Sequence, residues 1–207
     1  MGIVDAVFPV KCVGCKACGK YICQECYMSV RRSSRPIERS SGEMTRVYAT
    51  YQYGGVVQKL LKKVKYKSSW KMVDELAERW SERVSDAMLD EVSECEVVVT
   101  SVPMYKLCQR ERGFNQAERL GRKLADELGV EYIETMRRTR ATKPMYGLDK
   151  KARRENVKGA FEMREKMSAE LVILVDDVWT TGSTMRECAK MLRKMGIEEI
   201  WGVVVAR

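Results

Sequence analysis

The most informative absence in this chain is histidine, which does not occur once in the 207 residues. Without an imidazole, the protein cannot use Ser-His or Cys-His nucleophilic catalysis, and no metal can be held by histidine. A zinc site would therefore have to consist of thiolates and carboxylates. Asparagine is almost as scarce, since it occurs at Asn115 and Asn156 alone, and both positions lie within the motifs described below.

Long apolar runs and nucleotide-binding glycine motifs are also missing. No stretch approaches the length of a membrane span, and the first ten residues lack the basic region and apolar core of a secretion signal. We therefore expect a soluble, cytoplasmic protein. The sequence contains neither GxGxxG nor GxxxxGK followed by Ser or Thr, so a dinucleotide or P-loop nucleotide site is not indicated.

The charge balance is strongly basic, with a formal net charge of +9 and a pI of about 9.1. This balance favours anionic partners, either nucleic acid or phosphorylated small molecules, although a basic surface that is simply solvated is an equally good interpretation. The length suffices for one α/β domain and a small appendage.

Five of the eight cysteines lie in one short N-terminal stretch. Cys12 and Cys15 form one CxxC pair, and Cys23 and Cys26 form a second, a pattern typical of a tetrahedral zinc site. Cys18 is a possible substitute ligand, because it also stands three residues after Cys15. A disulfide framework is the alternative, but it fits poorly with a cytoplasmic chain and an odd local number of cysteines.

The composition divides the chain into three parts. Residues 1–28 would form the four-cysteine zinc knuckle, a small zinc-ribbon-like module. Residues 29–44 are rich in serine and arginine and indicate a basic linker. Residues 45–207 would form the larger domain.

Within the larger domain, hydrophobic periodicity predicts strands that alternate with helices. Such alternation is typical of an α/β fold with a mostly parallel sheet flanked by helices, in which ligands bind outside the carboxyl ends of the strands. The core stripe of the second helix is expected to be Met72, Leu76, Trp80, Val84 and Leu89. The expected strands are 47–53, 95–102, 131–136, 171–175 and 200–206, and the expected helices are 56–66, 70–91, 115–128 and 184–195.

The segment from 172 to 184 carries the clearest functional signal. Four aliphatic residues lead to Asp176 and Asp177, and a run of hydroxyl residues around Gly182 precedes a helical pattern. Backbone N–H groups in such a turn, at a helix N-terminus, bind a phosphate well. Carboxylates would repel that phosphate, so the acids must hold another part of the same ligand, such as a ribose diol or a hydrated metal. The alternative is that the acid pair merely caps the helix and faces solvent.

This segment resembles the phosphoribosyl diphosphate (PRPP) signature of type I phosphoribosyltransferases, except that Trp179 stands where an aliphatic residue is common. Three further motifs, in the same order along the chain, resemble ComF-type competence proteins. The first is Phe8-Pro9 with the two CxxC pairs. The second is Val102-Pro103-Met104 followed by Arg110-x-Arg112-Gly113-Phe114-Asn115-Gln116-Ala117. The third is Arg138-x-Arg140-x-Thr142-Lys143-Pro144 followed by Arg153-x2-Asn156-Val157-x-Gly159-Ala160-Phe161.

The resemblance implies a role for each matching residue. Asp176 and Asp177 would hold the ribose 2′- and 3′-hydroxyls and serve catalysis. Arg110 and Arg112 would neutralise the pyrophosphate, since arginine offers a bidentate fork. The 5′-phosphate would lie on Thr180, Thr181, Gly182, Ser183 and Thr184. The pyrophosphate loop would be Val102, Pro103 and Met104. The second motif adds Asn115 and Gln116 as acceptor-side candidates, although Asn115 could simply cap the helix that it begins.

The implied chemistry does not require a histidine. Displacing pyrophosphate from the anomeric carbon builds negative charge on the leaving group, which Mg²⁺ bound with PRPP and the arginines would stabilise. The resemblance thus implies a phosphoribosyltransferase with structural zinc and an acceptor that has no signature in the sequence. The alternative is a non-catalytic DNA-uptake or regulatory module that uses the PRPP pocket as a sensor, with single-stranded DNA or a helicase as partner. Arg110 and Arg112 would then be a basic turn that contacts DNA phosphates.

Overall fold

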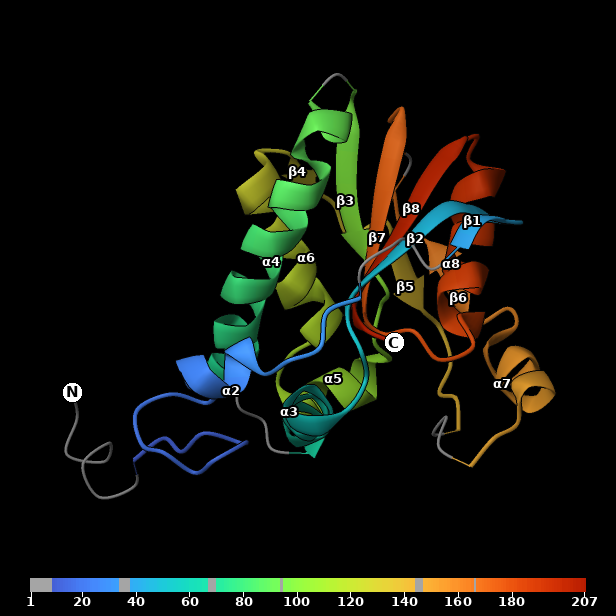
Figure 1. The fold of residues 1–207 in the computed structure, drawn as a ribbon. Helices are drawn as coiled ribbons and strands as arrows, with labels where there is room; N and C mark the ends of the chain where they lie inside the picture. The colour runs from blue at the N-terminus through green and yellow to red at the C-terminus, as the bar shows by residue number, and fades with distance from the viewer. Residues whose placement is uncertain (1–8, 34–37, 67–69, 94, 144–146, 166) are drawn as a thin grey trace.

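The computed structural model describes residues 9–33, 38–66, 70–93, 95–143, 147–165 and 167–207. Two residues of the sequence motifs, Phe8 and Pro144, lie outside these ranges. Within them, a six-stranded sheet has the order β1-β2-β8-β7-β3-β4 (Figure 1). Strands β2, β8, β7, β3 and β4 run parallel, whereas β1 pairs with β2 in an antiparallel hairpin. The expected mostly parallel sheet is therefore confirmed.

The elements have the following bounds. The strands of the main sheet are β1 Glu38–Ser41, β2 Met44–Tyr51, β3 Val97–Ser101, β4 Glu131–Tyr132, β7 Leu171–Val178 and β8 Glu199–Ala206. A separate antiparallel pair consists of β5 Met136–Arg138 and β6 Phe161–Met163. The helices are α2 Gln24–Met28, α3 Gly55–Tyr66, α4 Trp70–Val92, α5 Lys106–Arg112, α6 Gln116–Leu128, α7 Lys150–Val157 and α8 Ser183–Lys194.

Two hydrophobic cores cover the two faces of the sheet, because side chains of a strand alternate between faces. On β7, Ile173 and Val175 join a core with α3, α4 and α6. Val172 and Leu174 join a second core with α8. Figure 1 shows α4 and α6 on one side of the sheet and α8 on the other. The continuous apolar run of β7 thus reflects a strand that is buried on both faces.

The main differences from the expected elements have local causes. The expected strand 131–136 is divided, because Thr135 is buried and hydrogen-bonded through its hydroxyl to Thr100 at 2.9 Å, and the chain then pairs with β6 instead. On α4, Leu89 is 49% exposed and Met88 is buried in its place. Leu89 lies five residues after Val84, which turns it by roughly 140° from the stripe.

The expected linker is partly built into the larger domain. Residues 38–41 form β1, and Arg32 and Ser33 pair with the outer edge of β2 through backbone contacts with Tyr51 and Thr50. An open strand edge offers unpaired N–H and C=O groups, and this segment supplies partners for them. Residues 34–37 of the expected linker lie outside the described ranges.

Helices α3 and α5 lie beneath the edge of the sheet where the parallel strands end (Figure 1). This edge is the usual position of ligand sites in such folds. Across the described ranges, no helix combines the length and the apolar character needed to cross a membrane.

Candidate functional site

Asp176 and Asp177 stand near the carboxyl end of β7, between β8 and β3. Because neighbouring side chains of a strand point to opposite faces, the two acids point to opposite sides. Asp177 faces α6 and is 5% exposed. Asp176 is half-buried and lines a small hollow with the loop that precedes α8. The acids do not cap α8, since its N-cap residue is Gly182.

The carboxyl group of Asp176 titrates far from its usual range. Burial raises its pKa to about 7, and the charge of Asp177 adds to the rise. A hydrogen bond of 2.8 Å from the backbone N–H of Asp177, together with the charges of Lys65 and Arg138, acts in the opposite direction. Such a carboxyl changes its charge near neutral pH, so a bound cation or hydroxyl can readily shift its ionisation.

Asp177 is held by a network that joins three separate elements. Lys65, in the last turn of α3, places Nζ 2.7 Å from Oδ2 of Asp177. Gln116, at the start of α6, donates from Nε2 to the same oxygen at 3.2 Å. Arg112, at the end of α5, donates to Oε1 of Gln116 at 2.6 Å. One cation, Lys65, therefore contacts the buried carboxylate directly, and a second, Arg112, is linked to it through Gln116.

Residues 180–184, the segment that the sequence predicts to cradle a phosphate, form the loop after β7 and the start of α8. Helix α8 begins at Ser183, so the backbone N–H groups of its first turn have no acceptor within the helix. Thr181 and Ser183 share a hydrogen bond between their hydroxyls at 2.8 Å. Asp176 and the residues that follow it line one small hollow. The lining residues after Asp176 are Val178, Trp179, Thr180, Thr181, Gly182, Ser183, Thr184 and Met185. A phosphate on these N–H groups would thus lie beside Asp176.

Gly182 and Trp179 determine the shape of this loop. Gly182 has a φ of +70°, a conformation that favours glycine. A Cβ atom at this position would also overlap the indole ring of Trp179. Trp179 is buried in the α8 core, and the guanidinium of Arg186 lies 5.3 Å from its ring centroid. The tryptophan that departs from the usual motif therefore packs directly beneath the cradle.

The second motif lies next to the acid pair. Asn115 caps α6 by accepting from the N–H of Ala117, and it donates to the carbonyl of Val102 at 3.1 Å. Asn115 therefore caps the helix that it begins, as one interpretation of the sequence held. The same side chain also anchors the loop of Val102, Pro103 and Met104. Arg112 joins the network around Asp177, whereas Arg110 is exposed in the last turn of α5.

Arg138, from β5, is a site residue whose position the sequence did not reveal. Its guanidinium carbon lies 5.5 Å from the ring centroid of Phe161, and its charge lowers the pKa of Asp176. Its Nε is buried and has no hydrogen-bond partner among the described residues. Burial lowers the pKa of Arg138 itself, against the charge of Asp176. Lys65 was missed for a similar reason, because nothing distinguishes it from its lysine neighbours on α3.

Four cysteines form a cluster that suits one metal ion. The Sγ atoms of Cys12, Cys15, Cys23 and Cys26 all lie within 4.8 Å of one another. A tetrahedral zinc with bonds of about 2.3 Å separates its sulfur ligands by about 3.8 Å, so the donors fit. Cys18 is exposed and lies outside the cluster. The geometry therefore selects the two CxxC pairs over the substitute ligand.

Two thiols of the cluster, those of Cys12 and Cys26, have pKa values that are shifted in opposite directions. Burial alone would raise the pKa of Cys12, but N–H groups of Cys23, Cys15 and Gly14 outweigh it and lower the pKa to about 6. The pKa of Cys26 rises to about 12 through burial and the neighbouring cysteines. Gly14 is required here for space, since a Cβ would lie 2.5 Å from Sγ of Cys26. A cation would relieve the crowding of these sulfurs by stabilising the thiolates.

The knuckle is packed onto the larger domain. Val13 and Ile22 are buried in the core shared with α3 and α4, where they lie with Val57 and Leu60. The carboxylate of Glu75, on α4, accepts hydrogen bonds from the N–H groups before α2. The four-cysteine segment is thus integrated with the helices that flank the sheet.

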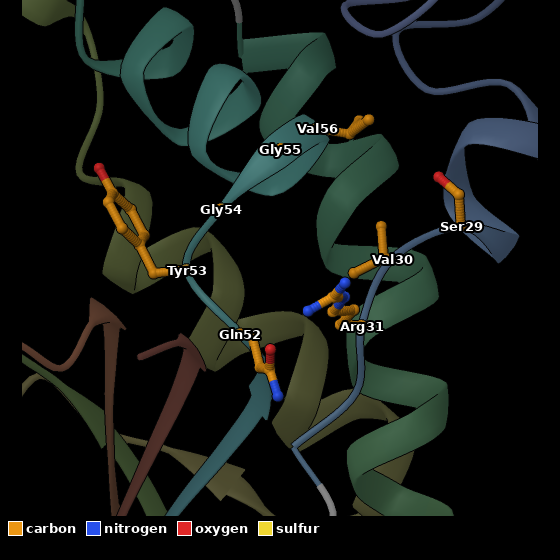
Figure 2. A pocket seen from close by; sticks show the side chains of 8 residues that line it. All are labelled: Ser29, Val30, Arg31, Gln52, Tyr53, Gly54, Gly55 and Val56. Atoms are coloured by element: carbon orange, nitrogen blue, oxygen red, sulfur yellow. The ribbon is translucent and has the colours of Figure 1, made fainter.

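A further hollow lies where the chain after α2 passes the turn between β2 and α3 (Figure 2). Its volume is about 340 Å³. Arg31 extends into the space beside this turn, whereas the ring of Tyr53 points away from Val30 and Arg31 (Figure 2).

The fold and this site together define a class of protein. Residues 112–207 match the family model described as a phosphoribosyl transferase domain. That span contains the second motif from Arg112 onward, the acid pair and the cradle. Residues 112–207 are therefore similar to a phosphoribosyl transferase domain, and the chain combines a mostly parallel sheet with an N-terminal four-cysteine cluster, as the sequence motifs suggested.

Comparison with curated proteins shows which phosphoribosyl transferase-like proteins the chain is similar to. The chain is 40% identical over 114 residues to competence protein F of Haemophilus influenzae, an alignment that covers 52% of this chain and 50% of that protein. It is 36% identical over 106 residues to the DNA utilization protein YhgH of Salmonella typhi, covering 50% and 47%. The corresponding Escherichia coli K12 protein is 35% identical over the same length. The matched region spans about half the length of these relatives, and it confirms the similarity to ComF-type proteins.

Proposed function

We propose that the chain binds PRPP with Mg²⁺ at the carboxyl end of β7 and transfers or recognises its phosphoribosyl group. One observation carries the proposal: Asp176 lines the same hollow as the loop at the N-terminus of α8. A phosphate on the loop N–H groups would bring a ribose within reach of that acid. The match of residues 112–207 to a phosphoribosyl transferase domain supports this ligand.

The charged residues near the carboxyl end of β7 fit the charge changes of the reaction. Asp176 would accept a ribose hydroxyl in its ionised form, and Arg112, Arg138 and Lys65 would offset the negative charge of the ligand. When bound, Mg²⁺ supplies further stabilisation of the pyrophosphate that leaves. Removal of one such electrostatic contact typically costs roughly 3 kcal/mol in the barrier. The reaction needs this charge stabilisation of the leaving group more than it needs a strong base.

We also propose that the four cysteines hold a structural zinc. The fit of the donors supports this assignment, and thiolate ligands require the reducing conditions of the cytoplasm, where we expect the protein to act. Because the site stands apart from the acid pair and all four ligands come from the protein, its role would be in folding rather than in the reaction.

A thermal shift assay tests the pocket. PRPP with Mg²⁺ should raise the Tm of the wild-type protein, and the double substitution Asp176→Ala, Asp177→Ala should abolish the rise. No shift in a folded wild-type protein would refute the pocket. Incubating PRPP with a panel of nucleobases and with single-stranded DNA, with release of pyrophosphate as the readout, then distinguishes a transferase from a protein that only binds.

The second candidate function is a non-catalytic role in DNA uptake, with the PRPP pocket as a sensor. It is favoured by the names of the relatives, a competence protein and a DNA utilization protein. Single-stranded DNA and a helicase would be its partners. Two results together would support this second function. The protein would bind PRPP but release no pyrophosphate with any of the acceptors, and it would retain a single-stranded oligonucleotide only when PRPP is present.

A further inference from the structure

The ion pair between Lys65 and Asp177 is the least expected contact at this edge of the sheet. Its two atoms are 2.7 Å apart, and Asp177 is almost fully enclosed, whereas the side chain of Lys65 is 37% exposed. Burying a carboxylate without a partner is costly. Burial by itself would lower the pKa of Lys65, but the charge of Asp177 raises it, so the ammonium stays protonated.

This contact occupies the group that the ribose of PRPP would need. Lys65 and Gln116 both approach Oδ2 of Asp177. A carboxylate has about four lone-pair positions, but a ribose hydroxyl on this oxygen would compete with the ammonium of Lys65. Since Gln116 is buried between Asp177 and Arg112, Lys65, on its flexible stem, is the partner that can leave.

The side of the sheet on which Lys65 lies indicates where it would go. The phosphate cradle lies on the Asp176 side, whereas Lys65, Gln116 and Arg112 lie on the Asp177 side. The ribose would bridge the two sides, so the second anionic group of the ligand, its pyrophosphate, would fall near Lys65 and Arg112. A lysine ammonium is a mobile point charge suited to such an anion.

We propose that Lys65 is the counter-ion of Asp177 in the ligand-free protein and moves to the pyrophosphate of PRPP when a ribose hydroxyl takes its place. This inference rests on the proposed function. It adds a positioning and binding residue from α3, which lies outside the matched domain residues 112–207. The knuckle packs against the same helix through Gly14 and Val56, and so supports the position of Lys65.

Isothermal titration with two ligands tests the proposal. PRPP carries a pyrophosphate, and ribose 5-phosphate, used as the matched probe, does not; both are titrated with Mg²⁺. Lys65→Met should weaken PRPP binding about tenfold or more, the equivalent of one charge-assisted contact. Binding of ribose 5-phosphate should stay equal or become tighter, because the competing ammonium is gone. Lys65→Arg should remain within about threefold of the wild type for PRPP.

The controls separate this inference from the proposed function. Lys62→Met removes an exposed lysine of the same helix and should change neither affinity. Retained binding of ribose 5-phosphate shows that Lys65→Met is folded, and if it is not folded, Lys65→Arg and Lys65→Gln are compared instead. A parallel loss for both ligands, or no loss for PRPP, overturns the role of Lys65. A wild-type protein that binds neither ligand overturns the proposed function and this inference with it.

Discussion

The carboxylate of Glu75 accepts a hydrogen bond of 2.9 Å from the backbone N–H of Ile22. A second bond of 3.0 Å comes from the N–H of Tyr21. One acid on α4 thus satisfies two backbone donors directly before Cys23, a member of the four-cysteine cluster. Because Ile22 is also buried in the core, the knuckle and the larger domain should unfold together.

Glu75→Ala should therefore destabilise the whole protein. Two charge-assisted hydrogen bonds to partly buried backbone donors are lost, which predicts a decrease of about 2 to 4 kcal/mol in the free energy of unfolding. Urea denaturation followed by circular dichroism measures it. Glu78→Ala, at an exposed position one turn further on α4, is the control and should change little. If both substitutions lowered the free energy of unfolding equally, the hydrogen bonds to Glu75 would not stabilise the protein.

Metal content distinguishes the cluster ligands. Freshly reduced protein should contain one zinc per chain, and Cys12→Ser or Cys26→Ser should lower both this content and the Tm, because a structural metal contributes to folding. Cys18→Ser should leave both unchanged, since Cys18 lies outside the cluster. Elemental analysis and thermal denaturation make the comparison. Reduced protein without metal, and knuckle cysteines found oxidised, would favour disulfides instead.

Gly182→Ala should damage the cradle through two separate effects. The left-handed backbone costs about 1 to 2 kcal/mol for a non-glycine residue, and the new methyl group overlaps Trp179. Gly129→Ala is the matched control, because its φ of +68° is nearly the same and its Cβ would meet nothing within 4 Å. Gly182→Ala should lower the free energy of unfolding more than Gly129→Ala does, and the difference measures the overlap with Trp179. In the double variant, Trp179→Val should recover part of that difference.

The stability of the protein should fall as the pH rises through the titration of Asp176. Its pKa is about 7 in the folded protein and about 3.9 in an unfolded chain. Between these values the folded state holds a proton that the unfolded state has released, so the free energy of unfolding decreases from about pH 4 to about pH 7. Asp176→Asn removes this proton linkage.

Urea titrations at several pH values check this prediction. The advantage of Asp176→Asn over the wild type should be small near pH 4, should grow as the pH rises and should level off above pH 7. Asp90→Asn, at an exposed position on α4, should show no such trend. A difference that stays constant across this range would place the pKa of Asp176 near its ordinary value.

Much of the candidate site could be proposed from the sequence, because its parts are local in the chain. The two CxxC pairs, the strand that ends in Asp176 and Asp177, and the loop around Gly182 are short segments whose residue types state their chemistry. The parallel sheet followed from alternating strand and helix periods. Helix α5 and the pair β5 and β6 could not be predicted, because they are short and carry little periodicity of their own.

The amino-acid sequence by itself determined which chemical groups the protein possesses: cysteines in two pairs, an acid pair beside a loop of glycine and hydroxyl residues, and no histidine. Only the tertiary structure decided how these groups are combined. It excluded Cys18 from the cluster, turned the two acids to opposite faces, and brought Lys65 to Asp177. The physical reason is that these relations depend on packing between distant segments, in which one lysine among several on α3 reaches a buried carboxylate because the core fixes the rotation of its helix.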